Sequence, residues 1–242
     1  MKKPQKISPS SRMKTRKKED RETVYHRISR NNAKQCDCKD CYRSRFALSK
    51  YCRVHHYRYV TYGSPDGRRI PPNEYSHEEQ LVTDFLKKHV DHPAIKSAVA
   101  WFTTWLTDAR DKKPVTGSSE FYWLYSKGVE GIDCLKRVLS IWLYAHNHPH
   151  RLPGDVRLDY ALSNAVTGLV SRPPVGTHYV GKEKRYTYRE VSIVDRREIG
   201  VRIRRTLFNL CENAVRGIEK ELDKEYQMTV NLSKPFDAEE TN

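Results

Sequence analysis

The sequence predicts a mainly α-helical protein. We expect a disordered basic arm and a small Cys- and His-rich module at the N-terminus, followed by a helical domain with a short β-hairpin. Apolar residues recur at intervals of three or four along most of the chain after residue 76, which is the period of an amphipathic helix. Four of the six cysteines lie between Cys36 and Cys52. The formal net charge of +15 is concentrated in residues 1–70, where 20 Lys and Arg face 6 Asp and Glu.

The first 23 residues consist mainly of Lys, Arg, Ser and Pro, with almost no apolar side chains. Such a composition cannot bury enough apolar surface to offset the entropy of ordering the chain. We therefore expect residues 1–23 to form a disordered arm. They lack the apolar stretch of a secretory signal, and no stretch of the chain approaches the roughly 18 apolar residues of a membrane span. We expect a cytoplasmic protein without membrane contact, in which clustered thiols stay reduced.

Residues 24–70 form the predicted Cys/His module. Zinc is held by four tetrahedral Cys or His ligands, commonly as two closely spaced pairs across a longer loop. The sequence offers such pairs in six residues: Cys36, Cys38, Cys41, Cys52, His55 and His56. Either of the first two can pair with Cys41 and either histidine with Cys52, which predicts a Cys3His zinc site. Because this segment holds little apolar surface, we expect Zn2+ to supply its folding free energy, about 10–16 kcal/mol for structural zinc.

The order Cys-x4-Cys, ten residues, Cys-x2-His and an aromatic and basic run ending in Gly-x-Pro resembles a small zinc-finger module of bacteriophage DNA-binding proteins. This module also accompanies HNH endonuclease domains. The matching residues here are Cys36, Cys41, Cys52, His55, Arg58, Tyr59, Gly63 and Pro65. The resemblance covers residues 36–65. It implies Cys36, Cys41, Cys52 and His55 as the zinc ligands and the cytoplasm of a bacterial host as the location.

Basic residues surround the module and alternate with aromatic residues. Lys and Arg neutralise phosphates, and exposed aromatic rings stack on bases. We therefore predict nucleic acid as the partner, DNA in preference to RNA. Contacts to the backbone are favoured over base readout, because nothing in the motif encodes a base-edge contact. The candidate nucleic-acid-binding residues are Arg43, Arg45, Lys50, Arg53, Arg58, Arg68 and Arg69.

The rest of the chain reads as a linker over 71–76, a helical domain over 77–228 and a polar tail over 229–242. Ser76 followed by Glu79 predicts a capping box at the start of the first helix. Alternating residues on either side of a glycine predict a β-hairpin of Thr177–Val180 with Arg185–Arg189. Apolar spacing predicts helices over 77–90, 94–110, 121–128, 131–147, 156–170 and from 199 to beyond 218.

Two other functions stay open at the level of sequence. The module could be a protein–protein interaction unit with purely structural zinc, either a virion component or a modulator of a host enzyme, with a host or phage protein as its partner. It could also belong to an HNH-like endonuclease, since Asp91 and His92 resemble the first element of that site. The residues that follow them contain neither the Asn nor the His that the site needs. We therefore assign no catalytic residue and expect a non-catalytic protein. The basic stretch 182–205 is either a second contact or a surface of mixed charge.

Overall fold

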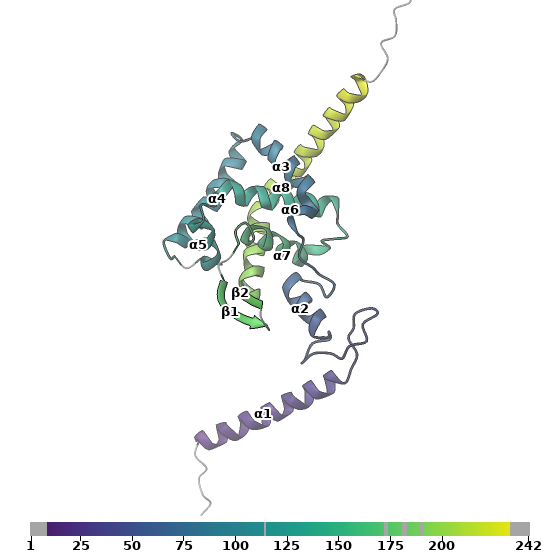
Figure 1. Cartoon of the computed structure of the whole chain (residues 1–242), viewed down its shortest axis with the longest axis vertical. Coiled ribbons are helices and arrows are strands. Elements are labelled where there is room, and N and C mark those ends of the chain that lie inside the picture. The colour runs from purple at the N-terminus through teal and green to yellow at the C-terminus, as the bar shows by residue number, and fades with distance from the viewer. Residues whose placement is uncertain (1–8, 114, 172–173, 181–182, 189–190, 233–242) are drawn as a thin grey trace, which may run out of the picture. The chain divides into compact units, whose positions relative to one another are not determined.

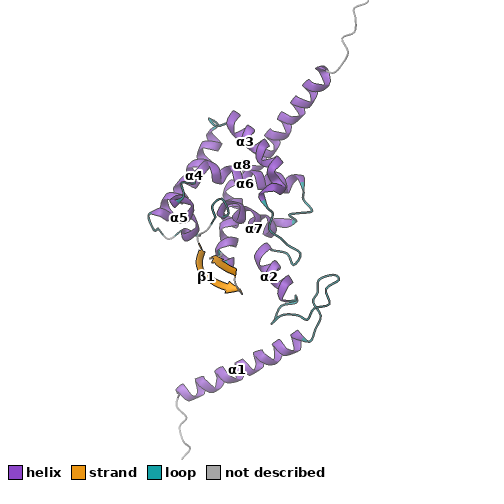
Figure 2. Cartoon of the chain, in the orientation of Figure 1, coloured by secondary structure: helices purple, strands orange, loops and turns teal. Residues whose placement is uncertain are grey.

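The computed structural model describes residues 9–113, 115–171, 174–180, 183–188 and 191–232. The chain divides into two compact units, Met1–Arg68 and Arg69–Asn242. Most described residues are helical, which confirms the predicted fold class (Figure 2). Among the described helices, none combines the length and the apolar character that crossing a membrane requires.

The first unit contains two helices, α1 (Pro9–Asn32) and α2 (Arg53–Tyr62), joined by an irregular loop (Figure 1). The backbone is helical from Pro9, where we expected a disordered arm up to residue 23, and residues 1–8 lie outside the described residues. None of the residues 21–32, the part of α1 whose side chains are described, is buried. Lys, Arg and Glu are good helix formers, so a segment that offers nothing to a core can still prefer a helix.

The second unit is a helical bundle packed around α6 (Gly131–Asn147) (Figure 1). This helix has ten buried residues, and a helix that is apolar around most of its circumference is expected at the centre of a bundle. The surrounding helices are α3 (Ser76–Lys88), α4 (Pro93–Arg110), α5 (Ser118–Ser126), α7 (Gly154–Thr167) and α8 (Ile193–Leu232). Of these, α3, α4, α7 and α8 pack directly against α6.

The predicted hairpin is present between α7 and α8, although Arg189, the last residue of its predicted second strand, lies outside the described residues. Its strands β1 (Pro174–Val180) and β2 (Glu183–Tyr188) pair antiparallel, with His178 opposite Arg185.

The last helix is longer than its apolar pattern indicates, since α8 runs from Ile193 to Leu232. It therefore takes in the first four residues of the expected polar tail, and residues 233–242 lie outside the described part of the chain.

The segment expected to be a linker is part of the helical unit. It forms a short 3-10 turn, η1 (Pro72–Tyr75), and Tyr75 is only 3 % exposed. The Tyr75 ring meets Tyr144 of α6 edge-on at 6.5 Å between centroids, and Arg137 Nη1 donates to the Tyr75 hydroxyl at 3.1 Å. The prolines do break the helical pattern, but the tyrosine that follows them anchors the turn to the core.

The predicted capping box at the start of α3 is wrong. Ser76 is the first residue of the helix, and its hydroxyl donates back to the carbonyl of Asn73 at 3.2 Å. The Glu79 carboxylate accepts instead from Arg137 Nη1 at 2.7 Å. A long-range charged partner on α6 thus replaces the local contact that the spacing suggested.

Arg204 of α8 neutralises a buried carboxylate of α7. Its Nε donates to Asp159 Oδ1 at 2.6 Å, and its Nη1 lies 2.8 Å from Asp155 Oδ2. Asp159 is 3 % exposed, and burial raises the pKa of its carboxyl group although Arg204 opposes the shift. We expect Arg204→Met to lower the free energy of unfolding by about 3–5 kcal/mol, because it leaves a buried charge without its partner. Urea denaturation of the purified variant measures this loss.

The destabilisation of Arg204→Met should be smaller near pH 4 than near pH 7. Without the guanidinium, burial raises the folded-state pKa of Asp159 further above its unfolded value. A group of this kind favours the folded state at low pH, and that contribution is lost as pH rises through the folded pKa. Arg216→Met on the exposed side of α8 is the matched control and should change stability by less than about 0.5 kcal/mol. An equal loss at both pH values would show that lost packing, rather than the unpaired charge, is the cause.

Candidate metal centre

Four side chains of the first unit converge on one point. They are Cys36, Cys41, Cys52 and His55, and their ligand atoms all lie within 4.8 Å of one another. Cys36 and Cys52 are buried, whereas Cys41 and His55 are half-buried. The group could hold a metal ion. These are the four residues that the resemblance of the motif implied.

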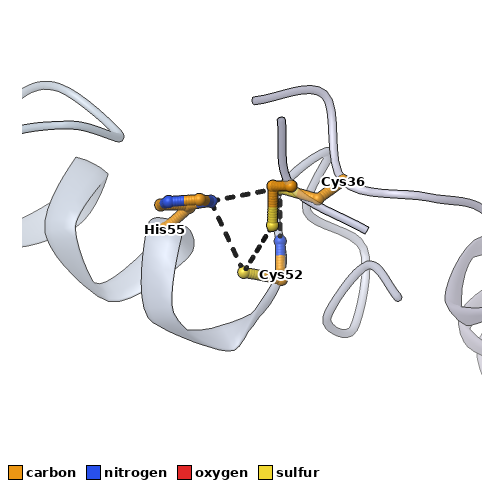
Figure 3. A group of neighbouring side chains, drawn as sticks. Cys36, Cys52 and His55 are labelled. Atoms are coloured by element: carbon orange, nitrogen blue, oxygen red, sulfur yellow. Dashed lines mark hydrogen bonds between the residues drawn. The ribbon is translucent and has the colours of Figure 1, made fainter. Parts of the chain in front are cut away.

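The start of α2 supplies two of the four ligands. Cys52 is the N-cap of the helix, and His55 lies in the first turn. Residues three apart share one side of a helix, so the Cys-x2-His spacing turns both side chains the same way. His55 Nδ1 lies 3.6 Å from Cys52 Sγ, and Figure 3 shows the two side chains turned toward each other. The helix ends at Tyr62, and the φ of 73° at its C-cap Gly63 is left-handed, so the Gly-x-Pro sequence of the motif is a helix stop.

The loop between α1 and α2 supplies the other two ligands. It turns back on itself, since the Cys36 amide donates to the Arg43 carbonyl at 2.9 Å and the Cys41 amide to Cys38 at 3.2 Å. Cys36 Sγ accepts from the Cys52 amide at 3.2 Å and lies 3.4 Å from His55 Nδ1 (Figure 3). The sulfurs of Cys41 and Cys52 are 3.9 Å apart, far beyond the roughly 2.05 Å of a disulfide.

The thiols of the loop differ in acidity. Burial acts to raise the pKa of Cys36, but hydrogen bonds from the Cys38 and Cys52 backbones and from His55 outweigh it and lower that pKa to about 6. Burial and the hydrogen bond to Cys36 raise the pKa of Cys38 to about 12. The hydrogen bond from the Arg43 backbone acts to lower the pKa of Cys41, but burial and the hydrogen bonds to Cys36 and Cys52 outweigh it and raise that pKa as well. The choice of Cys36 over Cys38 therefore rests on which ligand atoms converge, and not on acidity.

The two alternative ligands have other surroundings. Cys38 lies outside the group of four and forms a second group with His55 and Asp66. The His56 Nδ1 lies 3.0 Å from Ser49 Oγ, and its ring packs 5.6 Å from the ring of Phe46. His56 therefore helps to pack the loop against α2 and is not a member of the group of four.

A groove lies beside the metal centre, within the same unit. It has a volume of about 490 Å³. Three of the seven candidate nucleic-acid-binding residues, Arg53, Arg58 and Arg68, line it. The full lining consists of Arg53, Val54, Tyr57, Arg58, Tyr62, Gly67 and Arg68.

The structure does not gather the other four candidates in this groove. Arg45 holds the loop together, since it pairs with Asp37, donates to the Gln35 carbonyl at 2.9 Å and contacts Asn31. Lys50 lies over the ring of the neighbouring Tyr51 at 5.3 Å. Arg43 is exposed on the Cys loop, and Arg69 belongs to the second unit. A basic residue close to a cysteine in sequence can serve the fold of the loop, which spacing alone does not reveal.

The aromatic residues of the module fall into two sets. Tyr51 and Tyr59 pack against each other at 5.4 Å, as Phe46 and His56 do. Tyr57 and Tyr62 line the groove instead. The sequence alone did not distinguish these two tyrosines from the other aromatic residues of the module, nor did it indicate Val54. Their spacing was the available signal, because Val54, Tyr57 and Arg58 lie three and four residues apart and share one face of a helix.

The residues that resemble an HNH element have structural roles. Asp91 and His92 lie between α3 and α4 rather than on a strand. His92 is the N-cap of α4 and its Nδ1 accepts from the Ala94 amide at 3.3 Å, while Asp91 pairs with Lys96 at 2.7 Å. The two residues therefore stabilise the start of a helix.

Comparison of the chain with family models, curated proteins and solved structures finds no match.

Proposed function

We propose that the first unit is a zinc-dependent, non-catalytic module that binds nucleic acid, with DNA as its expected partner. The observation that carries the proposal is the double role of α2. This helix of ten residues supplies Cys52 at its cap and His55 in its first turn to the metal centre, and five lining residues to the arginine-rich groove. Metal binding therefore fixes the same helix that presents the basic side chains.

The distances between the ligand atoms fit zinc. With Zn–S bonds of about 2.3 Å and Zn–N bonds of about 2.0–2.1 Å, a tetrahedron places two sulfurs about 3.8 Å apart and sulfur and nitrogen about 3.6 Å apart. The sulfurs of Cys41 and Cys52 are 3.9 Å apart, and His55 Nδ1 lies 3.4 and 3.6 Å from two sulfurs. Three thiolates with one imidazole also form a ligand set typical of structural zinc.

The charge of the unit favours a polyanion as the partner. Residues 1–70 carry 20 Lys and Arg against 6 Asp and Glu, a net charge of +14, whereas residues 71–242 carry 25 against 24. Arginine pairs with phosphate in a bidentate geometry, and three arginines line one groove. The resemblance of the motif to DNA-binding modules of bacteriophages is consistent with this partner.

Binding of labelled DNA by the full-length, zinc-loaded protein tests the proposal. We expect the double variant with Arg53→Gln and Arg58→Gln to bind DNA more weakly. At 0.1 M salt, its affinity should fall roughly tenfold for each phosphate that the protein no longer neutralises. The glutamines keep most of the side-chain length, so the weaker binding reports charge. Removal of the metal with a chelator should abolish binding through the groove, because α2 is then no longer anchored by Cys52 and His55.

Arg216→Gln with Lys220→Gln is the matched control, because it removes the same charge from exposed positions of α8. This variant should bind DNA as the unmodified protein does. Equal losses of affinity for both pairs would mean that net charge alone attracts DNA. Absence of binding at low salt would overturn the proposal and favour a protein partner for the module.

A further inference from the structure

We propose that the groove beside α2 takes unpaired bases, so that the module binds single-stranded DNA in preference to duplex. This inference rests on the proposed function and names the form of nucleic acid that the site recognises. Its basis is the mixture of side chains in the groove. Arg53, Arg58 and Arg68 are interspersed with Val54, Tyr57 and Tyr62, and among the described residues that line the groove none is acidic.

The apolar and aromatic part of this lining separates the two forms of DNA. In a duplex the faces of the bases are stacked inside the helix, and a protein meets phosphates and base edges. On a surface that contacts only phosphates, an exposed valine and an exposed tyrosine add no binding free energy. An unpaired base, in contrast, presents its face, and binding sites for single strands combine basic residues with aromatic rings on which bases stack.

Tyr57 is the side chain best placed to stack on a base. Half of its surface is exposed, and it follows Val54 by three residues and Arg53 by four, so the three side chains lie on adjacent parts of one helix surface. Arg58 comes next on the same side. Tyr51 and Tyr59 contact each other and lie outside the groove lining.

The groove is also held in place before any ligand arrives. Cys52 and His55 tie the first turn of α2 to the metal centre, and the last turn is closed by Gly63, whose amide donates to the Tyr59 carbonyl at 2.9 Å. Beyond it, Gly67 lies so close to Tyr62 that an added Cβ would come within 2.6 Å of the tyrosine Cβ. A preorganised wall of this kind lowers the entropic cost of binding a flexible strand.

The test compares one labelled sequence of about 16 nucleotides as single strand and as duplex, a length at the upper end of the sites bound by single-strand-binding folds. Fluorescence anisotropy measures the affinity of full-length, zinc-loaded protein for both. We expect tighter binding of the single strand. Tyr57→Leu should weaken that binding roughly 5- to 160-fold and leave duplex binding unchanged, since it removes the ring but keeps an apolar side chain. Tyr57→Phe keeps the ring and should bind as the unmodified protein does.

Tyr42→Leu is the matched control, because Tyr42 is 85 % exposed and lies outside the groove lining. It should leave both affinities unchanged, and zinc content measured for every variant shows that the centre is intact. Duplex binding as tight as single-strand binding, or Tyr57→Leu without effect on the single strand, would overturn the inference while the proposed function stands. If Tyr57→Phe binds the single strand as weakly as Tyr57→Leu does, the inference is overturned too, because the hydroxyl and not the ring would then account for the binding. If neither form binds, the proposed function falls as well.

Discussion

Replacing Cys52 with serine is expected to release the metal ion and unfold the first unit while the helical unit stays folded. Cys52 is 2 % exposed, and its amide donates to Cys36 Sγ at 3.2 Å, so this candidate ligand also links α2 to the loop. Among residues 21–68, four are buried, namely Cys36, Cys52, Thr61 and Gly67. Two of these are members of the metal group. The unit has almost no apolar core, so under the proposed function zinc binding, at roughly 10–16 kcal/mol for a structural site, would supply most of its folding free energy.

Elemental analysis and circular dichroism check this expectation. The unmodified protein should carry one zinc per chain, and Cys52→Ser should carry none. The thermal transition of the helical unit should persist, because the buried hydrophobic cluster runs from Tyr75 to Ile218 and includes no residue of the first unit. Cys38→Ser is the matched control, since Cys38 stands outside the group of four, and it should retain the metal. Retention of zinc by Cys52→Ser, or its loss from Cys38→Ser, would show that a different set of ligands binds the ion.

The sequence predicted the helical unit well because its helices have separate apolar faces. α6 was predicted over 131–147 and occupies Gly131–Asn147, since a run of apolar residues bounded by Gly131 and a histidine-rich segment leaves little choice. The start of α3 was predicted less well. The interactions that fix it, between Glu79 and Arg137 and between Tyr75 and Tyr144, join residues about 60 to 70 positions apart, and no local spacing encodes them.

The candidate site was predictable in its metal group and not in its groove. The spacing of Cys52 and His55 contains the geometry of a helix turn, so two ligands could be placed without the structure. Arg45 and Arg58 look equivalent as basic neighbours of the cysteines, yet Arg45 pairs with Asp37 inside the loop and Arg58 lines the groove. The role of each basic residue depends on how the loop folds around the four candidate ligands. No local spacing in the sequence encodes that fold.

Raising the salt concentration from about 50 to 200 mM is expected to weaken DNA binding by about 10³- to 10⁵-fold if the module and arm together neutralise 6–10 phosphates. Each neutralised phosphate releases condensed counterions, so log affinity falls linearly with log salt. The slope should be about −0.9 per phosphate for duplex and about −0.7 for a single strand. Anisotropy titrations across a salt series give the slope, and hence the number of phosphates that the protein neutralises.

Deletion of residues 1–23 should flatten this slope and weaken binding to all sequences alike. The deletion removes nine Lys and Arg against three Asp and Glu, a net charge of +6. It stops short of Asn31, whose amide donates to the carbonyls of Ala47 and Ser49 and so helps to fix the Cys loop. The metal centre and the groove should therefore survive, and zinc content checks that they do. Binding through the groove should remain, with a smaller salt dependence set by Arg53, Arg58 and Arg68. An affinity indifferent both to salt and to the deletion would mean that the basic block does not bind phosphates, and a protein partner would then account better for the module.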